Sequence, residues 1–259
     1  MIIFYVLLGA AIGSFLNVCI DRLPRQQSIW QPPSHCPDCG RGLGPLELIP
    51  VVSYLALRGR CRTCGAAIPR RVLVVEVFTA LLFAVLWGYY GPGSLLVVAT
   101  VYTCILVVVF FIDLEHRLVL NRVVYPSAAL ALVLSLLATV PGDPLLLTPT
   151  VPTLFSALAG GAVGFVAIYL PAWLSRGGMG AGDVKLAAFL GLALGLPAVL
   201  AGLFLGFAAG GLVAAFLLIT KLRGRRDPVP YAPFLAAGGW LAILYGNQMM
   251  AWYLARFFQ

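Results

Sequence analysis

The stretch Leu95–Ile112 reads LLVVATVYTCILVVVFFI and ends immediately before Asp113. It contains 18 residues without a charge, and about 20 apolar residues of α-helix span the hydrocarbon core of a bilayer. A strand of a membrane β-barrel would instead alternate apolar and polar residues over about ten positions. The stretch therefore predicts a transmembrane helix.

Apolar sequence of this kind makes up most of the chain. Of its 259 residues, 61% are hydrophobic and 10% are charged, whereas soluble domains are about 45–50% apolar and about 25% charged. The run Val184–Thr220 would be about 55 Å long as one helix, so we expect it to break near Gly195-Leu196-Pro197. The remaining apolar blocks are Ile2–Ile20, Val72–Tyr90, Val123–Val140, Thr153–Leu174 and Tyr231–Leu254. Together the blocks predict an all-α, polytopic membrane helix bundle of about eight transmembrane helices.

The basic residues indicate how this bundle is oriented. The chain carries 17 lysines and arginines and has a net charge of +8. With the loop 21–71 in the cytoplasm, every basic residue except Arg256 falls on the cytoplasmic side, as the positive-inside rule requires. We therefore expect both termini outside and lipid around the bundle. Topology accounts for the charge, and no nucleic-acid partner is expected.

Small residues recur every four positions in several apolar blocks, a spacing that lets helices approach closely in lipid. The rows are Gly160 and Gly164, Gly191 and Gly195, and Gly202, Gly206 and Gly210. We interpret them as helix-packing faces.

One segment, 21–71, is too polar for lipid and is the only sizeable soluble module that the sequence predicts. It separates a first transmembrane helix (1–20) from a membrane core of about seven helices (72–259). The module contains two Cys-x2-Cys-Gly motifs, which supply Cys36, Cys39, Cys61 and Cys64. Four thiolates suit one tetrahedral ion, so the spacing predicts a closed, structural zinc site. The alternative is two disulfides or free thiols, and a cytoplasmic location disfavours disulfides.

Acidic residues beside the apolar blocks are candidate functional groups, because carboxylates are costly within a membrane. Asp113 ends one block and Asp183 precedes another, and the predicted topology puts both on the cytoplasmic side. Two carboxylates at one depth can share a proton and activate water, as in aspartic proteases. Asp183 could instead be a helix N-cap. Glu76 is either a substrate or cofactor contact or a snorkelling interfacial side chain.

Several motifs resemble those of the type IV prepilin peptidases. Gly180-Ala181-Gly182-Asp183 is similar to the GxGD signature of membrane aspartic proteases and continues into Lys185-Leu186. Further similar segments are Gly13-Ser14-Phe15-Leu16-Asn17-Val18, Arg22-Leu23-Pro24, the two cysteine motifs, Leu57-Arg58-Gly59-Arg60-Cys61, Glu76 and Ile112-Asp113-Leu114. The resemblance covers nearly the whole chain. One departure is Leu120-Asn121, where the family often has proline and an acidic residue.

The resemblance implies an enzyme of the bacterial inner membrane that cleaves the leader peptide of type IV prepilins or pseudopilins at the cytoplasmic face. It implies Asp113 and Asp183 as the catalytic residues, with Gly180 and Gly182 supporting the catalytic loop. Lys185 would steer substrate or stabilise the ionised aspartate, and a solvated interfacial lysine is the competing interpretation. Members with the cysteine loop commonly also methylate the new N-terminal amine from S-adenosylmethionine, so the resemblance implies this second activity too.

Two other classes of protein fit parts of the pattern. A proton- or cation-coupled transporter would use Asp113, Asp183 and Glu76 along its pathway, but such transporters often contain repeated halves and none is evident here. A non-catalytic assembly scaffold would bind partners through the zinc module. Cleavage of a leader-bearing pilin peptide, and its loss with either aspartate, separates the enzyme from both.

Overall fold

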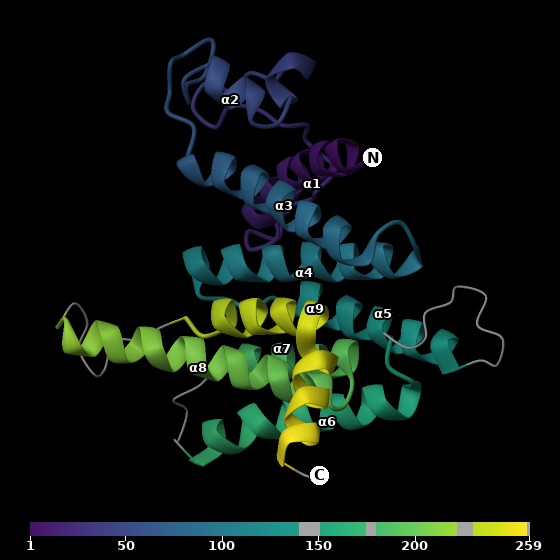
Figure 1. Cartoon of the computed structure of the whole chain (residues 1–259). Helices are drawn as coiled ribbons and strands as arrows, with labels where there is room; N and C mark the ends of the chain where they lie inside the picture. Colours follow the sequence, from purple (N-terminus) through teal and green to yellow (C-terminus); the bar gives the residue numbers. More distant parts are fainter. Residues whose placement is uncertain (140–150, 175–179, 222–229, 258–259) are drawn as a thin grey trace. The chain divides into compact units, whose positions relative to one another are not determined.

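The computed structural model describes residues 1–139, 151–174, 180–221 and 230–257 (Figure 1). In these ranges the regular structure is helical, apart from two isolated β-bridges. The helices are α1 (Ile2–Arg22), the 3₁₀ helix η1 (Pro45–Leu48), α2 (Val52–Ala56), α3 (Arg70–Tyr90), α4 (Ser94–His116), α5 (Asn121–Thr139), α6 (Leu154–Leu174), α7 (Ala181–Leu194), α8 (Ala198–Ile219) and α9 (Ala232–Phe257). The prediction of an all-α protein is confirmed.

Six of the described helices are long and apolar enough to cross a bilayer: α1, α3, α4, α5, α6 and α8. They make the chain a polytopic membrane protein. The count of eight spans is not confirmed, because α9 is not among the six and α7 has only 14 residues, about 21 Å of helix. The expected break is confirmed, since α7 ends at Leu194 and α8 begins at Ala198.

The chain divides into two compact units, Met1–Leu96 and Val97–Gln259. In the first unit α1 packs along α3. The two helices are close because α1 presents glycines to α3: a Cβ added to Gly13 would lie 2.9 Å from the Cα of Glu76. The cysteine motifs, η1 and α2 belong to this same unit.

In the second unit α7 is the central helix and contacts α5, α6, α8 and α9 (Figure 1). Its contact with α6 is backbone against backbone, because a Cβ added to Gly191 would overlap the carbonyl oxygen of Gly160. The interpretation of the glycine rows as packing faces is confirmed here. A hydrogen bond from the Trp240 indole of α9 to the Thr103 hydroxyl, at 3.1 Å, holds α9 against α4.

Candidate active site and metal centre

The second unit brings together the two aspartates that the sequence singled out. Asp113 lies in the last turn of α4 and is 5% exposed. Asp183 lies in the first turn of α7, and its backbone N–H donates to the carbonyl of Gly180 at 3.1 Å. The two carboxylates are close enough to interact electrostatically. Gly180 is itself the N-cap of α7, so the interpretation of Asp183 as the cap is wrong.

The start of α9 also reaches this pair of aspartates. The backbone N–H of Ala232 donates to the carboxylate of Asp113, and the preceding residue, Tyr231, is within electrostatic reach of Asp183. Sequence reasoning missed both residues. Tyr231 stands in the sequence only as the first residue of an apolar block, and no motif relates it to either aspartate.

The residues expected to support the catalytic loop lie around the first turn of α7. Gly182 faces the α4–α5 connection, because a Cβ added to it would lie 2.7 Å from the Cβ of Val119. Lys185 donates to the Asn121 side-chain oxygen at 2.9 Å, and its Nζ lies 5.5 Å from the ring centroid of Tyr125. Lys185 thus joins α7 to α5 through Asn121.

Glu76 lies in the first unit and is 4% exposed, so it is not a snorkelling interfacial side chain. Its carboxylate accepts a hydrogen bond from the backbone N–H of Val51 at 2.7 Å. Val51 has a φ of 63°, a conformation that side chains other than glycine rarely adopt. Glu76 therefore ties the soluble loop to α3 at a strained point of the backbone.

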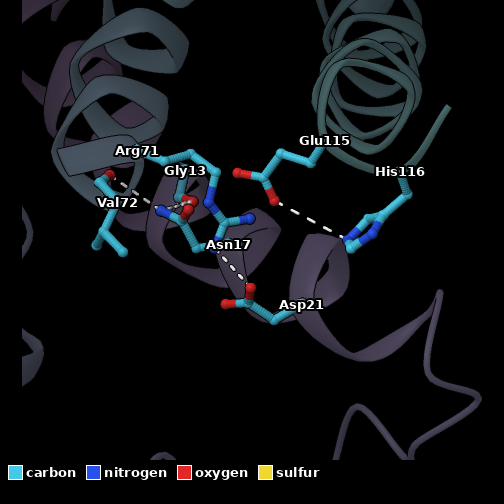
Figure 2. Close-up of polar contacts among 7 residues, drawn as sticks. All are labelled: Gly13, Asn17, Asp21, Arg71, Val72, Glu115 and His116. Atoms are coloured by element: carbon cyan, nitrogen blue, oxygen red, sulfur yellow. Dashed lines mark hydrogen bonds and ion pairs between the residues drawn. The ribbon is translucent and has the colours of Figure 1, made fainter. Parts of the chain in front are cut away.

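Polar contacts join α1 to the start of α3 (Figure 2). The side-chain amide of Asn17 donates to the carbonyls of Gly13 and Val72, at 3.3 and 3.1 Å. Its oxygen is buried and has no partner among the described residues. Arg71 forms an ion pair with Asp21 at 2.6 Å. At the end of α4, in the second unit, the His116 ring lies 4.0 Å from the Glu115 carboxylate.

The four cysteines of the two motifs form one cluster. The sulfur atoms of Cys36, Cys39, Cys61 and Cys64 all lie within 4.8 Å of one another, and all four are free thiols. The sulfurs of Cys36 and Cys64 are 3.7 Å apart, which fits the edge of about 3.8 Å that follows from a tetrahedron with metal–sulfur bonds of about 2.3 Å. The cluster could hold a metal ion. His35 is outside it and pairs with the carbonyl of Pro33 at 3.0 Å.

The two cysteine motifs close in the same way. Gly40 donates its backbone N–H to the carbonyl of Cys36 at 2.9 Å, and Gly65 donates to that of Cys61 at 3.0 Å. These glycines have φ values of 68° and 73°, which glycine adopts without the steric cost that a Cβ brings. The glycine after each Cys-x2-Cys pair therefore lets the backbone turn around the sulfurs.

Arg41 balances charge beside the cluster. It donates to Glu47 at 2.6 Å, and the other Glu47 oxygen accepts the backbone N–H of Gly44 at 2.8 Å. The Arg41 guanidinium, followed by that N–H, lowers the pKa of the Glu47 carboxyl. Arg41 also hydrogen-bonds to the sulfur of Cys61. One guanidinium therefore contacts both the Glu47 carboxylate and the cysteine cluster.

Fold and sites together define a class: an all-helical, multi-pass membrane protein with two aspartates paired at helix ends and a four-cysteine module. Residues 7–90 match the family model described as Bacterial Peptidase A24 N-terminal domain, and residues 100–215 match that of the Type IV leader peptidase family. The chain belongs to the type IV leader peptidase family, and the resemblance seen in its motifs is confirmed.

Similar proteins cover almost the whole chain. A prepilin leader peptidase/N-methyltransferase of Bacillus subtilis (strain 168) is 34% identical over 249 residues, 95% of each chain. The protein of that name from Aeromonas hydrophila is 33% identical over 284 residues, 97% of this chain and 93% of its own. The one from Pseudomonas aeruginosa is 32% identical over 281 residues, 96% and 92%. No solved structure matches the chain.

Proposed function

We propose that this chain removes the leader peptide of type IV prepilins or pseudopilins and then methylates the new N-terminal amine. Membership of the family and the names of the similar proteins support both activities. One observation carries the peptidase assignment: Asp113 and Asp183 come from two different helices and lie within electrostatic reach, inside the region that matches the peptidase family model.

In this proposal Asp113 and Asp183 are the catalytic pair. One carboxylate takes a proton from water, whose oxygen attacks the scissile carbonyl carbon, while the other carboxylic acid gives its proton to the carbonyl oxygen. The tetrahedral intermediate then collapses, the C–N bond breaks, and the leaving nitrogen takes up a proton. Gly180 and Gly182 hold the first turn of α7 in place for this chemistry. Lys185 fixes that turn to α5 through Asn121.

We assign Zn²⁺ to the cysteine cluster, in a structural role. Four sulfurs complete a tetrahedron and leave no open position for a substrate. Because the ion supplies part of the folding free energy of such a module, it would hold η1 and α2 in place relative to the cysteine motifs.

The distribution of basic residues supports an orientation. We place segment 21–71 and the aspartate pair on the cytoplasmic side of the bacterial inner membrane, with the N-terminus outside. A leader that has not crossed the membrane is then on the same side as the catalytic pair.

Methylation requires a methyl donor, and we assign this role to S-adenosylmethionine. Its sulfonium is a cation, which carboxylate and carbonyl oxygens attract. The first unit contains two buried oxygens of this kind near the α1–α3 contact: the Glu76 carboxylate and the unpartnered Asn17 side-chain oxygen. The residues present therefore suit such a cation, and we propose Glu76 as a cofactor contact.

The test of the peptidase assignment is a prepilin peptide incubated with the purified membrane protein and analysed by mass spectrometry. Asp113→Asn and Asp183→Asn should each abolish cleavage, because an amide can neither accept the proton of water nor replace the acid. Glu115→Gln, which removes an exposed carboxylate from the same helix as Asp113, is the matched control and should cleave normally. Turnover by either asparagine variant would overturn the assignment.

The same assay with S-adenosylmethionine tests Glu76. Glu76→Gln keeps an oxygen that can accept the Val51 N–H but removes the charge, so methylation should fall at least about tenfold while cleavage continues. Thr79→Val, one turn further along α3, removes a hydroxyl whose one bond among the described residues is to the Val75 carbonyl of the same helix. It should change neither product. Normal methylation by Glu76→Gln would show that Glu76 is not a cofactor contact and only anchors the loop through Val51.

A further inference from the structure

Two buried polar atoms in the second unit have no hydrogen-bond partner among the residues that the structure describes. They are Oδ2 of Asp113 and the hydroxyl oxygen of Tyr231. Buried polar atoms without partners are few in native proteins, and a catalytic role is one of their recognised causes. Both atoms belong to groups at the proposed catalytic pair.

The ring of Tyr231 is held in place from two sides. It packs against Phe207 of α8, with ring centroids 5.7 Å apart. Gly210, one turn along α8, leaves room for it, because a Cβ there would lie 3.0 Å from a ring carbon. The carbonyl of Tyr231 accepts the backbone N–H groups of Phe234 and Leu235, at 3.0 and 3.3 Å. The position of the hydroxyl is therefore set by packing on α8 and by the first turn of α9.

Two consecutive residues at the start of α9, Tyr231 and Ala232, each interact with one of the two aspartates. The Ala232 N–H donates to the carboxylate of Asp113, and Tyr231 lies within electrostatic reach of Asp183. The backbone N–H thus pairs with Asp113, whereas the neighbouring phenol of Tyr231 interacts with Asp183 and has no hydrogen-bond partner among the described residues. A phenol has an ordinary pKa of about 10, so its hydroxyl carries its proton at neutral pH and can donate it in a hydrogen bond.

We propose that the Tyr231 hydroxyl donates a hydrogen bond to the scissile carbonyl oxygen while attack by water makes that oxygen negative. The proposal rests on the peptidase function assigned to Asp113 and Asp183. In that reaction the proton of water goes to one carboxylate and the carbonyl oxygen receives its proton from the other. Tyr231 keeps its own proton throughout and stabilises the charge that develops on oxygen, as donors placed for an oxyanion do.

The test is Tyr231→Phe in the full-length membrane protein, assayed with the prepilin peptide. The substitution removes one oxygen that has no partner in the described structure, so the fold loses no hydrogen bond seen there. We expect kcat to fall by about 10²-fold, the loss typical of one oxyanion donor, with KM nearly unchanged. Tyr169→Phe is the matched control, because that ring stacks on Phe165 and is exposed, and it should keep the wild-type kcat.

A pair of peptide inhibitors separates this role from a structural one. One carries a hydroxyl-bearing tetrahedral carbon in place of the scissile carbonyl, and the other lacks only that hydroxyl. The wild type should prefer the hydroxyl-bearing peptide, and Tyr231→Phe should lose most of the preference. If Tyr231→Phe has the wild-type kcat, or keeps the wild-type preference between the two inhibitors, this proposal is overturned. The peptidase function would still stand in that case, provided that Asp113→Asn is inactive. Cleavage by either asparagine variant would instead overturn the assignment of the catalytic pair itself.

Discussion

At the scale of single residues, the thiols of the cysteine cluster differ in how strongly they hold their protons. Hydrogen bonds from the backbone N–H groups of Cys64 and Thr63 lower the pKa of Cys61 to about 6. At Cys64, the N–H of Ala66 favours the thiolate, but partial desolvation of the sulfur and hydrogen bonds with the neighbouring thiols raise the pKa to about 12. Cys61 is therefore ready to bind a metal at neutral pH, whereas Cys64 must release a proton to bind it.

This difference predicts how the metal responds to acid. The pKa of Cys61 is below that of an unfolded thiol, about 8.5, so its contribution to stability is present above that pH and is lost as pH falls through about 6. Protons then compete with the ion for every sulfur. Zinc measured by plasma mass spectrometry after dialysis should fall steeply on acidification below about pH 6. Full retention of zinc well below that pH would contradict the assignment of thiolate ligands.

Single residues also show where prediction from sequence stops. The cysteines and aspartates could be found because each belongs to a local pattern, a Cys-x2-Cys pair or an acid next to an apolar block. Tyr231 could not, because its relation to Asp183 depends on how α9 packs in the bundle. Glu76 was found, but its bond to Val51 was not, since that contact joins residues 25 positions apart.

At the scale of helices, the contact between α6 and α7 is the most sensitive to added volume. Gly191→Ala should destabilise the protein by about 1–3 kcal/mol or more, because its Cβ would overlap the carbonyl oxygen of Gly160 and backbone cannot move aside as a side chain can. Since α7 carries Asp183, cleavage activity should fall as well. Thermal unfolding in detergent, followed by circular dichroism, measures the first effect.

Gly211→Ala on α8 is the control for that experiment. Its added Cβ would meet no heavy atom within 4 Å, and alanine favours a helix over glycine by about 1 kcal/mol. We expect unchanged or slightly higher stability. Equal changes in stability in the two variants would show that the overlap of Gly191 with Gly160 is not what governs the effect.

Hydropathy located each long helix within the described ranges, and the break at Gly195, because a helix in lipid needs a long apolar segment. Hydropathy does not specify which helices pair. α6 packs on α7, and α8 on α9, through glycines of both helices, whereas α1 packs on α3 through glycines of α1 alone. Such glycine faces look alike in a sequence. Nor does it determine how many helices fully cross, since α7 is apolar but short.

At the scale of the whole molecule, the orientation can be tested from outside the cell. Gly93 lies between α3 and α4, and a side chain there would meet nothing within 4 Å. In intact spheroplasts, Gly93→Cys should react with a membrane-impermeant maleimide, because the proposed topology puts this connection outside.

The wild-type chain provides the control for this labelling. Its exposed cysteines, Cys39 and Cys64, belong to the module placed in the cytoplasm, so it should react only after the membrane is broken. If the wild type is labelled in intact spheroplasts and Gly93→Cys is no more reactive than the wild type, the chain has the opposite orientation.

The close contact of α6 with α7 also bears on motion. Helices that meet through long side chains can slide by exchanging rotamers, but glycines that meet backbone to backbone have no rotamers to exchange. The close contact of Gly160 with Gly191 fixes the position of α7 on α6. The first turn of α7, which carries Asp183, is therefore held rigidly against α6. The space that an extended peptide needs must then come from the neighbours of this helix pair, and opening and closing should leave the α6–α7 contact unchanged.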